Sequence, residues 1–320
     1  MKRIVISFII FSFVFKANSQ DLTLNSSQDA SAFIGAYFSP LSQSIGAGLN
    51  SSWYHTAKPH KLGGFGVSLS LNMVSVPDQL RFFDVNQLDN FSSNSTSTPT
   101  ILGEGQSGTI TYQSNGISGD FILPDQDYTI NAIPVPTLNA AVGLFKGTEL
   151  SIRFIPSYQY DFDFIGNISV EWYGGGIKHD ILQWIPLANK LPFDLSIQAA
   201  YSHFNTSFEI ESQSTKQNVE LNIDASTYNL ILSKKFAILT TYGSLGISTI
   251  NSQFEANTNF QLGSSQTLEF NVPIDFEFNH QSKIQATLGA RIQLAIFTIF
   301  AHQTFSEQPI SSAGIALGIR

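Results

Sequence analysis

The chain has 320 residues, a formal net charge of −8 and no cysteine, and 12% of its residues are charged. Soluble domains carry about 25% charged residues, so we expect a medium other than water to contact much of the surface. The lack of cysteine excludes a disulfide framework, a thiol nucleophile and a thiolate metal site. No basic cluster follows the N-terminal segment, so no nucleic-acid partner is expected.

Residues 1–19 are typical of a secretory signal peptide. Lys2 and Arg3 precede an apolar run over residues 4–15, and small residues follow it. Cleavage would leave a mature chain that begins near Gln20 with a net charge of about −11, because three basic residues and no acidic one are removed. The chain is therefore expected to be exported.

The next segment, residues 20–45, predicts a short amphipathic helix. Ser27 or Asp29 can cap its start, and Pro40 is expected to limit its end. Its apolar residues recur at helical spacing, and they are Ala30, Phe33, Ile34, Tyr37, Phe38 and Leu41. Two alternatives stay open for this helix: a plug inside the lumen of a barrel, or a helix that lies across the barrel mouth.

The rest of the chain, residues 46–320, predicts amphipathic β-strands. No stretch here approaches the roughly 18 to 20 uninterrupted apolar residues that a membrane-spanning helix requires. Apolar and polar residues instead alternate, as in a membrane barrel whose side chains face lipid and lumen in turn. The apolar rows, expected to face lipid, occupy residues 65–73, 150–164, 193–201, 219–225, 284–294 and 313–319. A closed barrel satisfies every backbone polar group in a bilayer.

We therefore predict an all-β fold, a transmembrane antiparallel β-barrel of about 12 strands, within a range of about 10 to 14, with a short N-terminal helical plug. The less certain strands depend on residues 44–57 and 258–280. The expected location is the outer membrane of a Gram-negative bacterium, with its lipids and the barrel assembly machinery as partners. Many exported barrels end on an aromatic residue that this machinery reads, whereas this chain ends Gly318, Ile319, Arg320.

Three tight joints set the predicted orientation, and they are Lys146-Gly147, Lys234-Lys235 and Leu294-Ala295. An even number of strand passages separates each joint from the next, so all three are expected at one end of the barrel. Outer-membrane barrels have short periplasmic turns and longer outer loops. Residues 77–136 are therefore expected outside the cell or folded into the lumen. Within them, residues 90–108 are rich in Ser, Thr, Asn and Gly with little reason to pack, and residues 108–123 predict a small hairpin.

Arg153 and Arg291 fall on the polar faces of their strands, so both are expected in the lumen. A cation there could hold the carboxylate of a fatty acid or another anionic ligand, which makes these two the candidate ligand-binding residues. The alternative is that they pair with acids of the lumen, such as Glu149, Asp161 or Asp163. This alternative is favoured, because buried charges require partners whatever the function.

Other polar groups favour structural roles. Lys178, His179 and Asp180 could take part in proton transfer or hold a metal, but one histidine and one acid are too few for a stable zinc site. His55 and His60 match no helical two-histidine motif and are interpreted as loop residues. No metal site and no cofactor are expected.

Enzymatic activity is not expected, and no catalytic residue is predicted. Ser202 and His203 are adjacent on one strand, which points their side chains to opposite faces. No Gly-x-Ser-x-Gly elbow and no phosphate-binding loop is present. Residues 174–176, a run of three glycines, predict a bend or bulge that would open a lateral gap towards lipid or only relieve crowding, and the second interpretation is favoured.

Five segments resemble a family of outer-membrane proteins common in Bacteroidota, a domain of unknown function near the FadL-type transporters of hydrophobic compounds. The segments are YFSPL at residues 37–41, GLNSSWYHTAKPHK at 48–61, GLFKGTELSIRFIP at 143–156, GGGIKHDILQWIP at 174–186 and SAG at 312–314. The likeness covers nearly the whole mature chain. It implies an N-terminal plug and a barrel that passes apolar molecules, and it carries over no ligand-binding residue.

These observations favour passive transport of small hydrophobic or amphipathic molecules across the outer membrane, with a hydrophobic small molecule as the ligand. The alternative is a structural or interaction barrel without transport, in which residues 77–136 bind a partner. A hydrolase is the third hypothesis, and it lacks a recognisable catalytic constellation.

Overall fold

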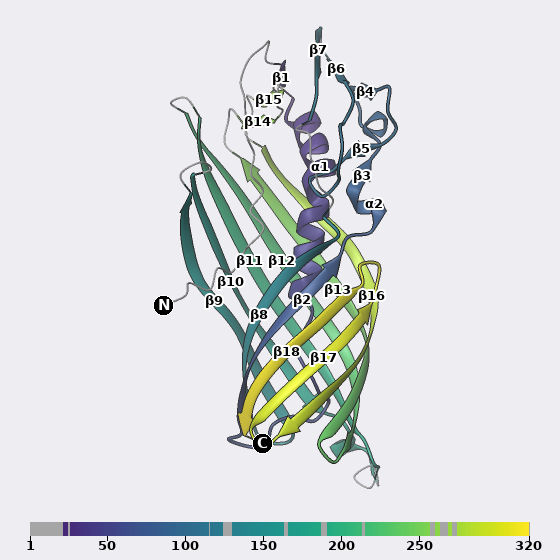
Figure 1. Cartoon of the computed structure of the whole chain (residues 1–320), viewed down its shortest axis with the longest axis vertical. Coiled ribbons are helices and arrows are strands. Elements are labelled where there is room, and N and C mark those ends of the chain that lie inside the picture. The colour runs from purple at the N-terminus through teal and green to yellow at the C-terminus, as the bar shows by residue number, and fades with distance from the viewer. Residues whose placement is uncertain are drawn as a thin grey trace.

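The computed structural model describes residues 22–24, 26–114, 116–123, 130–162, 166–186, 191–212, 215–256, 260–262, 268–270 and 274–319. Ten strands close into an antiparallel barrel in the order β10-β11-β12-β13-β16-β17-β18-β2-β8-β9 (Figure 1). Their bounds are Phe65–Ser75 for β2, Ala132–Gly143 for β8, Thr148–Phe162 for β9, Gly166–Asp180 for β10, Asp194–Ser212 for β11, Thr215–Phe236 for β12, Leu239–Ala256 for β13, Ile274–Leu294 for β16, Phe297–Phe305 for β17 and Ile310–Ile319 for β18.

The predicted all-β barrel is confirmed. Ten strands form it in the described part of the chain, which is the lower end of the predicted range of about 10 to 14 and below its central value of about 12. Residues 44–57 form no strand, because the end of a helix and a loop occupy them. In residues 258–280 the described parts are β14 (Phe260–Leu262), β15 (Leu268–Phe270) and the start of β16. β14 and β15 pair in a separate sheet with β1 (Leu22–Leu24), so they add no strand to the barrel.

An apolar belt surrounds the barrel. On β2 the predicted alternation is confirmed, since Leu69 and Leu71 are exposed whereas Ser70 and Asn72 are buried in the lumen. Every barrel strand contributes large exposed apolar side chains to the belt, among them Leu69, Leu138, Ile152, Ile177, Ile197, Leu230, Leu245, Ile284, Ile299 and Ile315. Exposing such a belt to water instead of lipid would cost a free energy of roughly 25 cal/mol for each Å² of apolar area.

Strand β12 extends beyond the belt, and there its two faces exchange polarity. The sequence analysis predicts that the apolar row at residues 219–225 faces lipid, and this prediction is wrong, because these side chains are buried inside the barrel and at most 6% exposed. Alternation continues without a break to Tyr228 and Leu230, which face outward. Period two separates two faces of a strand, but it does not say which face lies inside.

Helix α1 (Ser27–Leu49) lies inside the barrel with buried residues on every side (Figure 1). Ser26, one residue before the predicted caps, accepts a hydrogen bond on Oγ from the Asp29 N–H at 3.2 Å. The prediction that Pro40 limits the helix is wrong. Proline lacks the backbone N–H of a helical turn, but packing against the barrel wall stabilises the helix beyond it. Among the described residues, no helix is both long and apolar enough to span a bilayer.

The core of the protein lies between α1 and the barrel wall. It joins Phe33, Ile34 and Tyr37 of the helix to wall side chains that include Val74, Val135, Trp172, Phe204, Ile223, Ile250 and Phe254. The helix packs against β2, β8, β12, β13 and β16. Gly46 and Gly48 permit this close approach, because a Cβ on either would lie 2.5 Å from a wall side chain.

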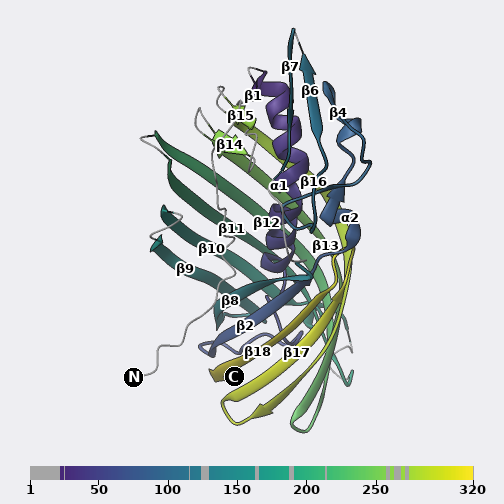
Figure 2. The ribbon, with the colours of Figure 1, turned by 45° about the horizontal axis from the view of Figure 1, so that its top comes forward.

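A cap module, the described residues of 77–123, folds at the barrel end where α1 begins (Figure 2). It contains α2 (Asp78–Arg81), β3 (Phe82–Phe83), the 3-10 turn η1 (Val85–Gln87), β4 (Phe91–Ser93), β5 (Thr98–Pro99), β6 (Ile110–Ser114) and β7 (Ile117–Phe121). The predicted hairpin in residues 108–123 is present as β6 and β7. Residues 90–108 do pack, contrary to expectation, because Phe91 stacks on Phe33 of α1 with ring centroids 5.1 Å apart.

The three tight joints all lie at the opposite end, which we call the turn end. They connect β8 to β9, β12 to β13 and β16 to β17 through residues 144–147, 237–238 and 295–296. The second joint falls three residues later than predicted, because β12 continues to Phe236. This arrangement confirms that the three joints share one end of the barrel.

Candidate functional site

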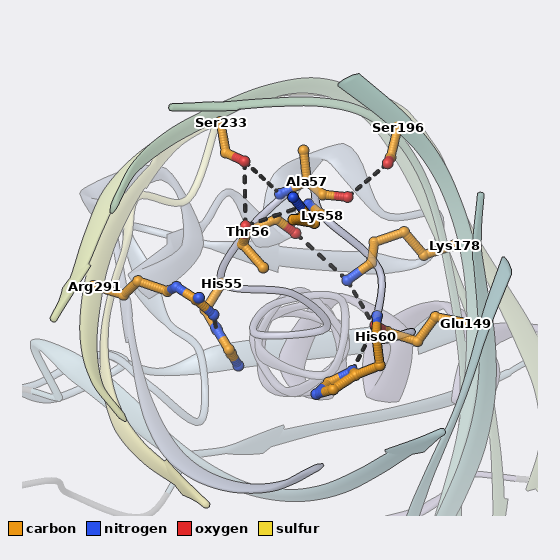
Figure 3. A network of polar contacts seen from close by, with 10 residues as sticks. All are labelled: His55, Thr56, Ala57, Lys58, His60, Glu149, Lys178, Ser196, Ser233 and Arg291. Atoms are coloured by element: carbon orange, nitrogen blue, oxygen red, sulfur yellow. Dashed lines mark hydrogen bonds and ion pairs between the residues drawn. The ribbon is translucent and has the colours of Figure 1, made fainter. Parts of the chain in front are cut away.

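A lumen loop, residues 50–64, follows α1 and fills the lumen at the turn end before the chain enters β2. Polar side chains from the barrel wall converge on this loop from both sides, as Figure 3 shows. The wall residues drawn there are Glu149, Lys178, Ser196, Ser233 and Arg291. The loop and the helix together form the plug of the barrel.

Arg153, one of the two predicted ligand-binding residues, holds the junction between helix and lumen loop. Its guanidinium donates to the carbonyl oxygens of Leu49 at 2.5 Å and Ser51 at 2.9 Å, and to Asn139 Oδ1 at 2.8 Å. It also lies over the Trp53 ring, with 4.1 Å between Cζ and the ring centroid. The last carbonyls of a helix have no partner within it, and a cation is favourable there. Among the described residues, the partners of Arg153 are therefore neutral groups of the plug and the neutral amide of Asn139 on β8.

Glu149 forms a buried ion network with Lys178 and His60. Its Oε1 lies 2.8 Å from Lys178 Nζ, and its Oε2 accepts from the His60 backbone N–H at 2.8 Å and lies 2.7 Å from His60 Nδ1. Glu149 and Lys178 are each 5% exposed, and buried charges require such partners. The sequence analysis missed this network, because no local pattern shows that residue 60 enters the lumen.

Arg291, the second predicted ligand-binding residue, also contacts the lumen loop. Its Nη1 lies 3.0 Å from His55 Nδ1, and its Nη2 donates to Gln293 Oε1 at 2.8 Å. Arg153 and Arg291 thus approach the plug from different strands, β9 and β16. Of the acids predicted to pair with them, Asp163 and the side chain of Asp161 lie outside the described residues.

Hydroxyl groups of the wall complete the attachment of the lumen loop. Ser196 Oγ donates to the Ala57 carbonyl at 2.6 Å, and the Ala57 N–H donates to Ser233 Oγ at 3.0 Å. The cavity left beside the loop measures about 40 Å³ and is lined by Glu149, Lys178 and Arg291 among others. Such a cavity has room for a few water molecules. In this conformation it is too small for an organic solute.

The residues of the run Lys178, His179 and Asp180 point in different directions. Lys178 is buried in the lumen, whereas His179 lies outside, 2.9 Å from Thr148 Oγ1, and accepts from Trp184 Nε1 at 2.8 Å. These contacts attach the turn end of β10 to its neighbours. Within the described ranges, no three His, Asp or Glu side chains gather in a way that could hold a metal ion.

Ser202 and His203 lie on opposite faces of β11, as predicted. Ser202 is fully buried in the lumen. His203 faces outward, and its Nδ1 lies 2.8 Å from Asp224 Oδ1, which also accepts a hydrogen bond from the Tyr201 hydroxyl. This polar cluster lies on the outer surface, where β12 passes out of the apolar belt.

The bulge predicted at residues 174–176 is displaced. The register of β10 against β9 shifts between Val170 and Trp172 instead. The glycines make space inside the barrel, because a Cβ on Gly176 would lie 2.7 Å from Ser151 Oγ and 3.2 Å from the Trp53 ring. They therefore relieve crowding against the lumen loop, which is the interpretation the sequence analysis favours.

The barrel wall contains a seam between β8 and β9, formed by residues 132–138 and 154–162. The two strands pair over five rungs only, and the last rung towards the cap module joins Asn139 to Arg153. Beyond it β8 pairs with β2 alone and β9 with β10 alone. Figures 1 and 2 show the two strands diverging from there towards the end that carries the cap module.

Two prolines mark the β8 side of the seam. Pro134 and Pro136 have no N–H to donate to a neighbouring strand, and proline is confined to edge strands, strand starts and bulges for this reason. Both lie in the part of β8 that pairs only with β2. The sequence of β8 thus contributes to ending its ladder with β9.

The sequence model of a family described as "Family of unknown function (DUF6588)" matches residues 1–319. No curated protein matches the chain. Among solved structures, the translocator domain of autotransporter NalP from Neisseria meningitidis is 11% identical with a TM-score of 0.36, over 92% of this chain and 100% of that chain. The CymD monoaromatic hydrocarbon channel is 8% identical with a TM-score of 0.27, over 89% of this chain and 92% of that chain. TM-scores this low do not establish a shared fold, so the architecture rests on the strand pairing of this chain.

Proposed function

This chain belongs to the DUF6588 family, and we propose that it is an outer-membrane barrel for the passive transport of small hydrophobic or amphipathic molecules. In this proposal a solute moves through the seam between the bilayer and the apolar part of the lumen. The plug closes the barrel between transport events. The observation that carries the proposal is the seam, where β8 and β9 do not pair with each other over residues 132–138 and 154–162.

The apolar belt supports a membrane location, because it covers all ten strands and would be costly in water. Barrels of the outer membrane have short periplasmic turns, which would place the turn end in the periplasm and the cap module outside the cell. Export through a signal peptide stays a prediction, since residues 1–19 lie outside the described residues.

The position of the seam supports lateral passage. Leu138 and Phe154 flank its closed end and are 41% and 54% exposed on the outside, so the seam begins within the belt. An unpaired backbone N–H or C=O in lipid costs several kcal/mol, and a purely structural barrel would avoid that cost with a longer ladder. Passage of a solute gives a physical reason for the ladder to stop at Asn139 and Arg153.

The lumen wall near the cap module supports an apolar solute. There Leu221, Ile223 and Phe254 point inward and are buried against α1, whereas the interior of a water-filled porin is polar. A shift of α1 would uncover this apolar surface beside the seam. The ion network and the two arginines hold the lumen loop at the turn end, so the shift is expected near the cap module.

A cross-link across the seam tests the proposal. The described residues contain no cysteine, and neither does the rest of the chain. A thiol-specific cross-linker therefore reacts only with an introduced pair of cysteines. The seam variant combines Leu138→Cys with Phe154→Cys, and a short bis-maleimide then links β8 to β9 at the positions next to the last rung. Ala140→Cys with Ile152→Cys, on an existing rung, is the matched control. Uptake of a labelled hydrophobic molecule into liposomes is the measurement.

The linked seam pair is expected to abolish uptake, whereas the linked control pair retains it. Equal uptake by both linked variants would exclude the seam as the route. No uptake by the unmodified protein would exclude transport altogether.

A structural or interaction barrel is the second candidate. It is favoured by the folded cap module, which is attached to the plug. Asn90 Nδ2 and the Tyr112 hydroxyl both donate to Asp29 of α1, at 3.0 Å and 2.8 Å, so the module is fixed to the plug. Shortening the β6–β7 hairpin by residues 113–118 removes its tip and keeps Tyr112. The second candidate predicts that this variant loses binding of a partner to the cell surface and that the unmodified barrel takes up no solute. The transport proposal predicts that the variant takes up solute as the unmodified barrel does.

A further inference from the structure

Several buried side-chain atoms in the described part of the chain have no hydrogen-bond partner, and two of the donors among them lie near the seam. The indole Nε1 of Trp172 and the hydroxyl Oγ of Ser202 have no hydrogen-bond partner among the described residues. Trp172 is 4% exposed and Ser202 is 0% exposed. Buried polar groups are nearly always hydrogen-bonded, and each exception needs an explanation.

Both donors lie beside the closed end of the seam. Trp172 is opposite Ile155 of β9, whose side chain packs inward just beyond the last rung. Ser202 is opposite Gly174, which is itself opposite Arg153 of that rung. A Cβ on Gly174 would lie 3.1 Å from Ser202 Oγ, so the glycine leaves the hydroxyl uncovered on the side that faces the seam.

The surface around the two donors is apolar. The Phe204 ring lies next to Trp172 with centroids 5.9 Å apart, and Ala225 is opposite Ser202 on β12. Both neighbours are buried, at 7% and 1% exposed. A solute that enters through the seam would thus meet an apolar surface that carries two donors and no acceptor to satisfy them.

We propose that Trp172 Nε1 and Ser202 Oγ form the polar end of a solute-binding site. They select molecules that are apolar except for a hydrogen-bond-accepting oxygen at one end, such as a ketone or ester carbonyl. The inference rests on the proposed transport function, because it assigns the selectivity of that route. The partners of the Arg153 guanidinium among the described residues are all neutral, so its charge favours an electron-rich oxygen and disfavours a cationic solute.

Two minimal substitutions test the site. Trp172→Phe removes the indole N–H and keeps an aromatic ring, and Ser202→Ala removes only the hydroxyl. Trp184→Phe at the exposed turn end and Ser226→Ala on the outer face of β12 are the matched controls. The probes are decyl methyl ketone, which carries one carbonyl, and dodecane, which carries none. Equilibrium binding to protein in lipid nanodiscs and uptake into liposomes are measured for each variant, after gel migration with and without heating has shown that the barrel is folded.

Each of the two substitutions is expected to weaken ketone binding by about fivefold, the effect of one lost hydrogen bond, and to leave dodecane binding unchanged. The control variants are expected to bind both probes as the unmodified protein does.

The outcomes separate this inference from the proposed function. If Trp172→Phe and Ser202→Ala bind the ketone normally while both probes are taken up, the donors hold water only and the inference fails with transport intact. If binding is selective but neither probe is taken up, transport fails and the site stands. An unmodified protein that binds neither probe overturns both.

Discussion

Arg153 of the barrel wall donates a hydrogen bond to the carbonyl oxygen of Leu49, the last residue of α1, at 2.5 Å. The same arginine forms the last rung between β8 and β9. One side chain therefore holds the end of the plug helix and stands at the base of the seam. The attachment of the plug and the last rung of the wall therefore meet at one residue.

Replacement of Arg153 by methionine is expected to loosen the plug. The substitution keeps an unbranched apolar stem but removes the Arg153 donor from the Ser51 carbonyl and from Asn139 Oδ1. The Leu49 carbonyl keeps a second donor, Trp53 Nε1, at 3.2 Å. Each buried group left unsatisfied costs about 1–3 kcal/mol, so the free energy of unfolding should fall by about 3 kcal/mol. Urea unfolding in lipid vesicles measures it. Amide hydrogen exchange should also become faster in residues 46–52.

The matched control for this variant is Lys235→Met. Lys235 is exposed near the turn between β12 and β13, and surface changes of this kind are usually within about 0.5 kcal/mol. A loss of stability in Arg153→Met no larger than in the control would contradict the role assigned to Arg153.

Replacement of Glu149 by glutamine is expected to destabilise the barrel more strongly. It removes the carboxylate that lies 2.8 Å from the ammonium of Lys178, and breaking a buried ion pair in this way costs about 3–5 kcal/mol. Adding Lys178→Met should restore part of that loss, because the buried cation that Glu149 neutralises is then removed as well. A double-mutant cycle of unfolding free energies measures the coupling, and a double variant no more stable than Glu149→Gln would argue against the ion network.

The edge of the apolar belt on β13 can be located with lysine substitutions. Leu245 and Asn251 both face outward, and Leu245 is 65% exposed within the belt. Leu245→Lys should destabilise the barrel by about 2–4 kcal/mol, as a lysine at the bilayer midplane does. Asn251→Lys, beyond the belt, should cost less than about 1 kcal/mol. Equal costs at the two positions, measured by unfolding in vesicles, would place the membrane elsewhere.

The attachment of the cap module is expected to weaken at high pH. Burial raises the pKa of Tyr112 above its ordinary value of 10.0, and the hydrogen bond to Asp29 raises it further. The folded state thus favours the protonated phenol, so its contribution to stability is complete below about pH 10 and is lost as the pH rises through the higher folded pKa. Near-ultraviolet circular dichroism during thermal unfolding, at about pH 9 and about pH 11, measures this loss.

Tyr112→Phe is the control for the pH experiment, since it removes the ionising group and keeps the ring. Its thermal midpoint should change less between the two pH values than that of the unmodified protein. Identical shifts in both proteins would assign the effect to other groups.

The alternation of apolar and polar residues was sufficient to predict the barrel, because a strand that separates lipid from lumen must repeat with period two. The same pattern placed Leu69 and Leu71 correctly outside and the three tight joints at one end. The helical spacing before the first strand was sufficient to predict α1. These features depend on residues that are neighbours along the chain.

Features that depend on contacts between distant segments could not be predicted in this way. Residues 219–225 have the same period whether they face lipid or a helix, and only the position of α1 decides that they face inward. Pro40 fails to end α1 because the surrounding wall stabilises the turns that follow. The sequence shows that Arg153 is a cation of the lumen, but it does not show whether its partner is a ligand, an acid or the end of a helix.

The sequence alone therefore determined that the chain forms an amphipathic β-barrel, because local periodicity is sufficient to predict one. The tertiary structure decided what lies inside the wall, which partners the lumen charges take and where the ladder between β8 and β9 ends. Those choices depend on the free energy of burying whole surfaces against one another, and no window of neighbouring residues contains that information.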